Sequence, residues 1–269
     1  MSASPTALSE SAIVARLRAA GCVFAEDEAR LLLAEAATPA ELAEMVDRRV
    51  SGLPLEPILG WVDFFGRRIE VDPGVFVPRR RTEFLVHQAA ALAGPGGVVL
   101  DLCCGSGALG VALASVVPGI ELHAADIDPV AVLCARRNVA ALGAMRAQTG
   151  YVYQGDLFEP LPETLRGRVD MLLANTPYVP TDEIGLMPPE ARLHEPLFTL
   201  DGGADGLDVQ RRVAASAAKW LAPGGHLLVE TGQDQAATTA EIFARNGLRV
   251  RIATSPELYA TIVIGTRPI

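Results

Sequence analysis

The sequence is poor in lysine. Lys219 is the only lysine among 269 residues, the other basic side chains are arginines and a few histidines, and the formal net charge is −9. A protein that binds nucleic acid along its backbone needs a broad basic surface, because the bound phosphates must be neutralised. The composition therefore argues against a nucleic-acid partner. Basic charge is densest in the arginine triplet at 79–81, for which a solvated surface is the simplest interpretation.

Long apolar runs are also missing. Hydrophobic residues make up 50% of the chain, yet no uninterrupted apolar stretch approaches the ~20 residues that are needed to cross a bilayer. The N-terminal residues contain no basic segment that leads into an apolar one, so nothing indicates a secretion signal. We therefore expect a soluble, cytoplasmic protein that does not bind membranes.

Metal-binding patterns are absent as well. The four cysteines include the adjacent pair Cys103 and Cys104, and none of them has the C-x-x-C spacing of a zinc site. The four histidines are scattered along the chain without the spacing of metal ligands. Reduced thiols and no metal ion are therefore expected.

Residues 1–53 are predicted to form a small helical domain. The clearest start signal is Thr38-Pro39-Ala40-Glu41, which combines a helix N-cap, a proline at the first helical position and a capping-box glutamate. Short helices of this kind bury too little surface for an enzyme core, so we expect a role in docking or presenting a substrate. Residues 54–74 are predicted to form a linker and a two-stranded β-ribbon, and residues 75–269 the main domain.

The main domain is predicted to be α/β. From residue 98 onward, short apolar runs alternate with helical patterns, which indicates βαβ units and a mostly parallel sheet. The stretch 179–208 is instead irregular and rich in proline, glycine and acidic residues. Long irregular stretches in compact domains are usually functional or disordered. The predicted strands are 98–102, 120–126, 151–154, 169–174, 226–230, 249–252 and 260–264.

A glycine-rich turn follows the first of these strands. Gly105, Gly107 and Gly110 satisfy the pattern G-x-G-x-x-G, and the helix that follows offers unpaired N–H groups to a nucleotide-type ligand. Asp126 ends the next strand, where a carboxylate can accept both hydroxyls of a ribose. An NAD-dependent oxidoreductase must therefore be considered.

Asp101 argues against a dinucleotide. A carboxylate at the start of the glycine turn would repel a pyrophosphate, but it could favourably meet a sulfonium or ammonium group. S-adenosylmethionine carries these cations and has no phosphates. After the predicted strand 151–154, Asp156 could accept from the amino group of an adenine, and Leu157 could pack on the adenine ring. We therefore predict S-adenosylmethionine as the cofactor.

The other half of the candidate site is Asn175-Thr176-Pro177-Tyr178, which follows the apolar run at 169–174. This position places an amide side chain at the carboxyl end of a predicted strand, where ligands bind in open α/β sheets. Taken alone, the motif is equally well explained as a turn that begins at an asparagine. The glycine turn and the three carboxylates on successive strands favour a site.

The order of these motifs resembles the class I S-adenosylmethionine-dependent methyltransferases that carry N-P-P-Y. Within them, it most resembles the protein-(glutamine-N5) methyltransferases of the HemK/PrmC type, which modify peptide release factors. The resemblance covers nearly the whole chain. It includes Glu56-Pro57-Ile58-Leu59-Gly60, Phe64-Phe65-Gly66, Val77-Pro78-Arg79 and Glu195-Pro196.

This resemblance implies a Rossmann-like fold with a seven-stranded sheet, and methylation of a glutamine in the Gly-Gly-Gln loop of a release factor, with S-adenosylhomocysteine as product. The side-chain oxygen of Asn175 and the backbone carbonyl of Thr176 would accept the two N–H groups of the substrate amide, with Pro177 and Tyr178 completing the catalytic motif. The implied cofactor-binding residues are Asp101, Cys103, Gly105, Ser106, Gly107, Asp126, Asp156, Leu157 and Asn175. The implied substrate-binding residues are Phe76, Pro78, Arg79 and Glu195.

The chain departs from the family pattern at three places. Cys103 replaces the usual first glycine of the cofactor loop, Thr176 replaces the second residue of N-P-P-Y, and Arg80 and Arg81 replace a proline and an acidic residue. Because Asn175 no longer precedes a proline, the site is expected to be less rigid or to accept a different shape. The alternatives are methylation of a small molecule or of an exocyclic nucleobase amine, and a degenerate, non-catalytic methyltransferase fold.

Overall fold

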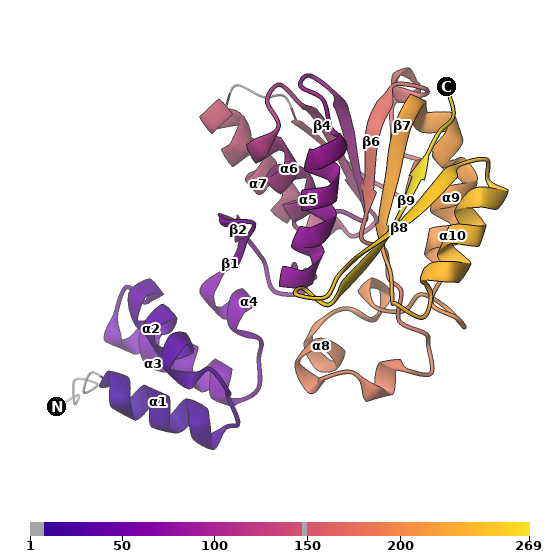
Figure 1. The fold of residues 1–269 in the computed structure, drawn as a ribbon. Coiled ribbons are helices and arrows are strands. Elements are labelled where there is room, and N and C mark those ends of the chain that lie inside the picture. Colours follow the sequence, from indigo (N-terminus) through magenta and orange to yellow (C-terminus); the bar gives the residue numbers. More distant parts are fainter. Residues whose placement is uncertain (1–7, 147–149) are drawn as a thin grey trace.

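The computed structural model describes residues 8–146 and 150–269. Figure 1 shows a small helical bundle near the N-terminus, a β-ribbon, and a larger α/β body that holds the C-terminus. The helices of the bundle share one core, in which Ile13, Leu32 and Val46 are fully buried. The bundle consists of α1 (Glu10–Ala19), α2 (Ala25–Glu35), α3 (Pro39–Val50) and α4 (Leu55–Leu59).

Helix α3 begins with the predicted signal. Thr38 is the N-cap, and its hydroxyl accepts a hydrogen bond from the backbone N–H of Glu41 at 3.1 Å. The carboxylate of Glu41 in turn accepts from the backbone N–H of Ala37 at 2.8 Å. The first bond satisfies an N–H group at the start of the helix that has no partner within it, and the second binds the residue before the N-cap.

Part of the predicted linker is helical, since Leu55–Leu59 form helix α4, which was not predicted. This stretch contains two prolines, at positions 54 and 57. They lie at the N-cap and in the first turn, where a helix has no partner for a backbone N–H and tolerates proline. Ile58 and Leu59 are buried in the core of the bundle, and Gly60 ends the helix with a positive φ of 81°. The domain limits at residues 53 and 74 stay a prediction.

The predicted ribbon is present as β1 (Trp61–Phe64) paired antiparallel with β2 (Arg67–Glu70). Phe64 and Ile69 are each 1% exposed, because both pack into the core of the α/β body. The ribbon is thus anchored on the main domain.

The α/β body is built on a seven-stranded sheet with the strand order β5-β4-β3-β6-β7-β9-β8. Neighbouring strands are parallel, except that β9 runs antiparallel to both β7 and β8. The predicted mostly parallel α/β fold is confirmed. The strands are β3 (Val98–Leu102), β4 (Glu121–Asp126), β5 (Gly150–Gln154), β6 (Val169–Ala174), β7 (Leu221–Glu230), β8 (Arg249–Ser255) and β9 (Ala260–Thr266).

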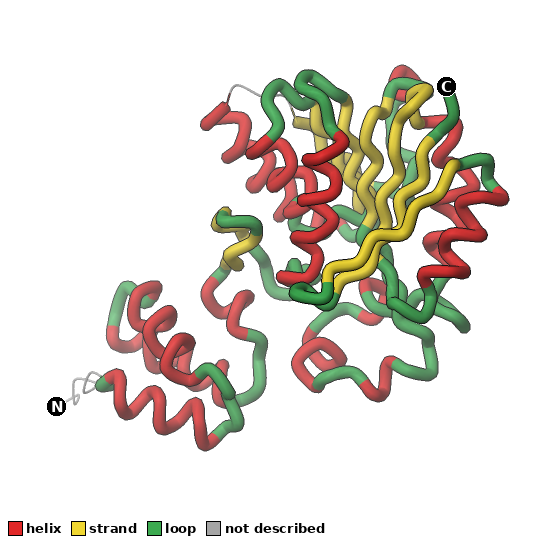
Figure 2. Tube along the Cα trace, viewed as in Figure 1, coloured by secondary structure: helices red, strands yellow, loops and turns green. Residues whose placement is uncertain are grey.

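Helices cover both faces of this sheet, as Figure 2 shows. On β6, Met171 and Leu173 pack toward one set of helices, whereas Leu172 and Ala174 pack toward the other. This alternation follows from the two-residue period of a strand, and burial on both faces explains why β6 is apolar at every position except Asp170. One set is α5 (Glu83–Leu92), α6 (Ala108–Val116) and α7 (Pro129–Arg146), and the other is α9 (Asp208–Trp220) and α10 (Ala236–Arg245).

The irregular stretch between β6 and α9 contains only short helices. One of its backbone contacts is an isolated bridge between Val179 and Asp201. Within the described residues, no helix is both long and apolar enough to cross a membrane. The remaining short helices are η1 (Arg80–Thr82), η2 (Glu163–Leu165), η3 (Ile184–Leu186), α8 (Pro189–His194) and η4 (Leu197–Thr199).

Candidate active site

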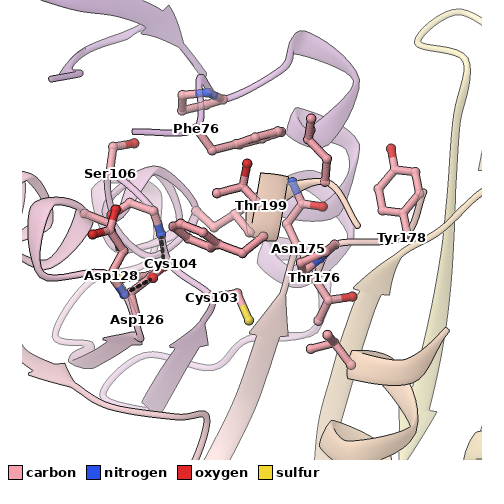
Figure 3. A pocket seen from close by; sticks show the side chains of 18 of the residues that line it. Phe76, Cys103, Cys104, Ser106, Asp126, Asp128, Asn175, Thr176, Tyr178 and Thr199 are labelled. Carbon is pink, nitrogen blue, oxygen red and sulfur yellow. Dashed lines mark hydrogen bonds between the residues drawn. The ribbon is translucent and has the colours of Figure 1, made fainter. Parts of the chain in front are cut away.

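A pocket opens where β3, β4 and β6 end, and most of the predicted site residues line it. In Figure 3, Ser106 and Asp126 lie on one side of this pocket and Asn175 and Tyr178 on the other, with Cys103 between them. The predicted residues on its wall are Phe76, Pro78, Arg79, Cys103, Gly105, Ser106, Asp126, Asp156, Leu157, Asn175, Thr176, Pro177 and Tyr178.

The glycine turn brings backbone close to this pocket. Gly105 and Gly107 have φ angles of 53° and 78°, which favour glycine, and the N–H of Gly105 donates to Asp126 Oδ2 at 2.8 Å. Cys103 has a φ of 53° as well, which explains why the family has a glycine there. The buried hydroxyl of Ser106 has no hydrogen-bond partner within the described part of the chain. A polar ligand in the pocket can supply one.

Gly110 has a packing role. A Cβ atom at this position would lie 2.6 Å from Leu122 Cδ1 and 3.2 Å from Asp101 Oδ2. The absence of a side chain therefore allows α6 to approach the sheet closely.

Asp101 lies beneath the glycine turn, and it is not among the residues on the pocket wall. Its Oδ2 accepts a hydrogen bond from the N–H of Gly110 at 2.9 Å, while its Oδ1 is buried without a partner in residues 8–146 and 150–269. Burial raises the pKa of this carboxyl to about 8. Without a cation beside it, this carboxyl therefore keeps its proton near neutral pH. Its predicted contact with a ligand stays a prediction.

Asp126 is positioned by the backbone on both sides. Oδ2 accepts from Gly105 at 2.8 Å, and Oδ1 accepts from the N–H of Asp128 at 3.0 Å. Burial raises the pKa of Asp126, and these backbone bonds oppose the increase. Because each oxygen of a carboxylate has two lone pairs, both can also accept a hydroxyl of a ribose.

Asp156 and Leu157 line the pocket after β5. Oδ2 of Asp156 is paired with Arg212 Nη2 of α9 at 2.7 Å. Arg212 also lines the pocket and was not singled out in the sequence, because nothing in the local pattern of α9 links it to Asp156. The pairing fixes one oxygen of Asp156, so that the other can accept from an adenine amino group.

The acceptor end of the pocket is formed where β6 stops. Among the described residues, the side chain of Asn175 forms no hydrogen bond, so its oxygen is available to a substrate. Thr176 is 2% exposed, and its buried hydroxyl has no partner in the same residues. The backbone carbonyl of Tyr178 accepts from Gln235 Nε2 at 2.9 Å, which holds the end of the motif.

Arg79 also lines the pocket. Its guanidinium pairs with Glu195 at 2.5 Å and lies over the ring of Phe76, 5.1 Å from the centroid. Glu195 itself does not line the pocket, and the same carboxylate oxygen accepts from the N–H of Val77 at 3.2 Å. Burial raises the pKa of Glu195, and the guanidinium of Arg79 opposes the increase. Glu195 thus supports Arg79 and the turn before it.

Two residues of the acceptor end were missed as site residues in the sequence, Arg81 and Glu230. Arg81 lines the pocket, and both side chains bind the hydroxyl of Tyr178. Glu230 carried a usable signal, since it ends a predicted strand as Asp126 does. Arg81 carried none, because its partners are distant in the sequence.

Comparison with known proteins gives the family. Residues 67–187 match the family described as Methyltransferase small domain. The chain is 40% identical over 212 residues to a release factor glutamine methyltransferase of Geobacter sulfurreducens, covering 78% of this chain and 72% of the relative. It is 37% identical over 265 residues to a protein of the same name from Cereibacter sphaeroides, covering 92% of each.

A relative with another substrate in its name matches as well. The 4-amino-L-phenylalanine/4-methylamino-L-phenylalanine methyltransferase of Streptomyces pristinaespiralis is 37% identical over 218 residues, which are 78% of this chain and 71% of the relative. A methyltransferase of Pyrococcus furiosus has a solved structure similar to 76% of this chain and 91% of its own, with a TM-score of 0.57 at 18% identity, which supports the methyltransferase fold. The predicted resemblance is confirmed, and the chain belongs to the release factor glutamine methyltransferase family.

Proposed function

We propose that this protein transfers a methyl group from S-adenosylmethionine to the side-chain amide nitrogen of a glutamine in a peptide chain release factor. The observation that carries the proposal is the position of Asn175. Its side-chain oxygen has no hydrogen-bond partner among the described residues, and it lies at the end of β6, in the pocket that the glycine turn and Asp126 also line. The relatives from Geobacter sulfurreducens and Cereibacter sphaeroides carry this activity in their names.

The pocket residues fit the cofactor. S-adenosylmethionine supplies a methyl group on a positively charged sulfur. Asp126 can accept the ribose hydroxyls, Asp156 can accept from the adenine amino group, and Ser106 has a buried hydroxyl to satisfy. The backbone of Gly105 can approach a ligand closely, since a Cβ atom there would meet only Phe76 O, at 3.9 Å.

The reaction needs an oriented nucleophile. An amide nitrogen is a poor nucleophile, because its lone pair is delocalised into the carbonyl. The side-chain oxygen of Asn175 and the backbone carbonyl of Thr176 accept its two N–H groups, orient the nitrogen and stabilise the positive charge that develops on it. The proton is then lost to water, and no general base is required beforehand.

We propose that the glutamine belongs to a Gly-Gly-Gln loop. Met187 and Phe198 also line the pocket, and large side chains of this kind leave less room for bulky neighbours of the glutamine. Glycines have no side chain, so a loop of this type can bring its backbone close to these residues. The net charge of −9 supports a protein partner rather than a nucleic acid.

The test is incubation with labelled S-adenosylmethionine and intact release factors, followed by mass spectrometry of the peptide with the Gly-Gly-Gln sequence. We expect a single added methyl group on the glutamine. Label on another residue, or no label on any release factor, would overturn the assignment.

A small amino acid is the second candidate substrate. The relative from Streptomyces pristinaespiralis is named for methylation of 4-amino-L-phenylalanine. Arg79 and Arg81 both line this pocket, and guanidinium groups bind carboxylates such as that of an amino acid. The same assay with 4-amino-L-phenylalanine distinguishes the two: label in the amino acid and none in the release factors favours this candidate.

A further inference from the structure

The hydroxyl of Tyr178 is held in a closed ring of hydrogen bonds. Arg81 Nη2 donates to this hydroxyl at 2.8 Å, the hydroxyl donates to Glu230 Oε1 at 3.1 Å, and Arg81 Nε donates to the same Oε1 at 3.0 Å. The three residues come from η1, from the turn after β6 and from the end of β7. We call Arg81, Tyr178 and Glu230 the tyrosine clamp.

The two charged residues of the tyrosine clamp differ in burial. The side chain of Glu230 is 2% exposed and that of Arg81 is 45% exposed, so the carboxylate lies beneath and the guanidinium reaches the surface. Burial and the neighbouring Glu230 raise the pKa of Tyr178, and this hydroxyl therefore stays protonated and donates to the carboxylate. Arg81 is the only cation that is hydrogen-bonded to Glu230 within the described residues.

The clamp lies at the place where the backbone of the motif has lost a constraint. With threonine at 176, Asn175 no longer precedes a proline, whereas Thr176 is still restricted by Pro177. Tyr178 is held at two points, by its hydroxyl in the clamp and by its backbone carbonyl, which accepts from Gln235. Fixing Tyr178 at both points limits the movement of the turn that carries the two acceptors of the substrate amide.

We infer that Arg81 and Glu230 are positioning residues of the methyl-acceptor site, which hold Tyr178, and through it Asn175 and the carbonyl of Thr176, in the geometry for methyl transfer. This inference rests on the proposed function, in which an N–H group of the acceptor binds at Asn175. By the resemblance described above, an acidic residue is usual at the position of Arg81.

The test compares Arg81→Met with Arg80→Met. Methionine keeps much of the length of the arginine and removes its donors and charge. Arg80 is exposed, and its side chain forms no hydrogen bond in the described part of the chain, so Arg80→Met is a matched control and should keep the wild-type rate. We expect Arg81→Met to lower kcat by about 100-fold, the effect of a misplacement of roughly 1 Å, with the affinity for S-adenosylhomocysteine unchanged.

Two further variants separate positioning from a general loss of structure. Arg81→Lys should recover part of kcat, because an ammonium keeps the charge but cannot make both bonds of the guanidinium. Tyr178→Phe removes the hydroxyl through which Arg81 acts. In the Tyr178→Phe background, Arg81→Met should therefore lower kcat by less than about threefold, far less than in the wild type. Such a difference is non-additivity, which is expected for residues in contact. Additive effects, or an unchanged kcat in Arg81→Met, would overturn the inference.

A structural readout does not depend on the acceptor. Crystals of the wild type and of Arg81→Met, both with S-adenosylhomocysteine, should show a displaced Tyr178 ring in the variant only. An unmoved ring overturns the inference even if methyl transfer to a release factor is found. If the wild type methylates no release factor, the proposed function fails, while the crystals still decide the inference.

Discussion

At the scale of single residues, Asn175 carries the main prediction. Asn175→Ala removes one of the two oxygens that accept the substrate N–H groups, and loss of one preorganised hydrogen bond in a transition state costs about 100-fold to 1000-fold in kcat. We expect methyl transfer to fall by this amount in a single-turnover assay. The thermal shift with S-adenosylhomocysteine should persist, because Asp126 and the glycine turn are untouched. Wild-type turnover in this variant would remove Asn175 from the mechanism.

Thr176→Pro tests how the departure from N-P-P-Y matters. The N–H of Thr176 donates no hydrogen bond to any described residue, so a proline there loses none, and its carbonyl remains as an acceptor. Proline also restricts Asn175 to extended backbone. We expect this variant to retain or raise kcat on a release factor, measured with the same mass-spectrometric assay. A large loss would show that the hydroxyl or the N–H of Thr176 is used.

The same scale shows what the sequence can reveal about the site. Asn175, Asp126 and Asp156 were identified because each lies at the end of a predicted strand or just after it, and parallel strands end at one edge of the sheet. Glu230 obeys the same rule. The bond from Arg81 to Glu230 joins residues 149 positions apart, and no local pattern encodes such a contact.

At the scale of elements, long apolar strands were the most predictable. The predicted bounds of β3 and β6 agree with the structure, because both strands are buried on their two faces. Helix α5 was missed, since its apolar residues show little helical period. Helix α8 was missed inside the irregular stretch, where it is only six residues long.

Helix α8 provides an element-scale prediction through Arg49 of α3. Arg49 binds Glu28 at 2.6 Å and Glu190 of α8 also at 2.6 Å, and its side chain is 9% exposed. Arg49→Met would leave the buried Glu28 without its cation, which costs about 3 kcal/mol or more. We expect a loss of this size in the free energy of unfolding of the helical bundle, measured by urea denaturation.

Glu190→Gln is the matched control for this prediction. It weakens the bond to α8 but keeps the pair of Arg49 and Glu28, and the side chain of Glu190 is 52% exposed. Exposed ion pairs contribute about 1 kcal/mol or less. If both variants lose the same amount of unfolding free energy, the buried pair of Arg49 and Glu28 is not what stabilises the bundle.

At the scale of the whole molecule, the sequence predicted the bundle and the sheet better than it predicted the segment that connects them. Alternating strands and helices predicted the sheet, and helix caps predicted the bundle. Helix α4 was not predicted, because its stretch contains prolines at 54 and 57. A single sequence cannot distinguish a proline in the first turn of a helix from a proline in a linker. Packing against the helical bundle decides whether such a stretch forms a helix or a linker.

The pH dependence of global stability is the prediction at this scale. Burial raises the pKa of Asp101 from 3.8 to about 8 in the folded protein, whereas the unfolded chain keeps the ordinary value. Between these values, the folded state binds one proton more than the unfolded state. A rise in pH through this window therefore destabilises the fold, by up to about 1.4 kcal/mol per pH unit from this group.

Asp101→Asn isolates this contribution. The amide oxygen can still accept from the N–H of Gly110, and asparagine does not titrate, so the variant should lack this part of the slope. We expect urea denaturation of the ligand-free protein between pH 5 and 8 to show a steeper loss of stability in the wild type than in the variant. Parallel curves would mean that Asp101 is ionised in the folded protein, because only a proton retained on folding makes stability fall as this window is crossed.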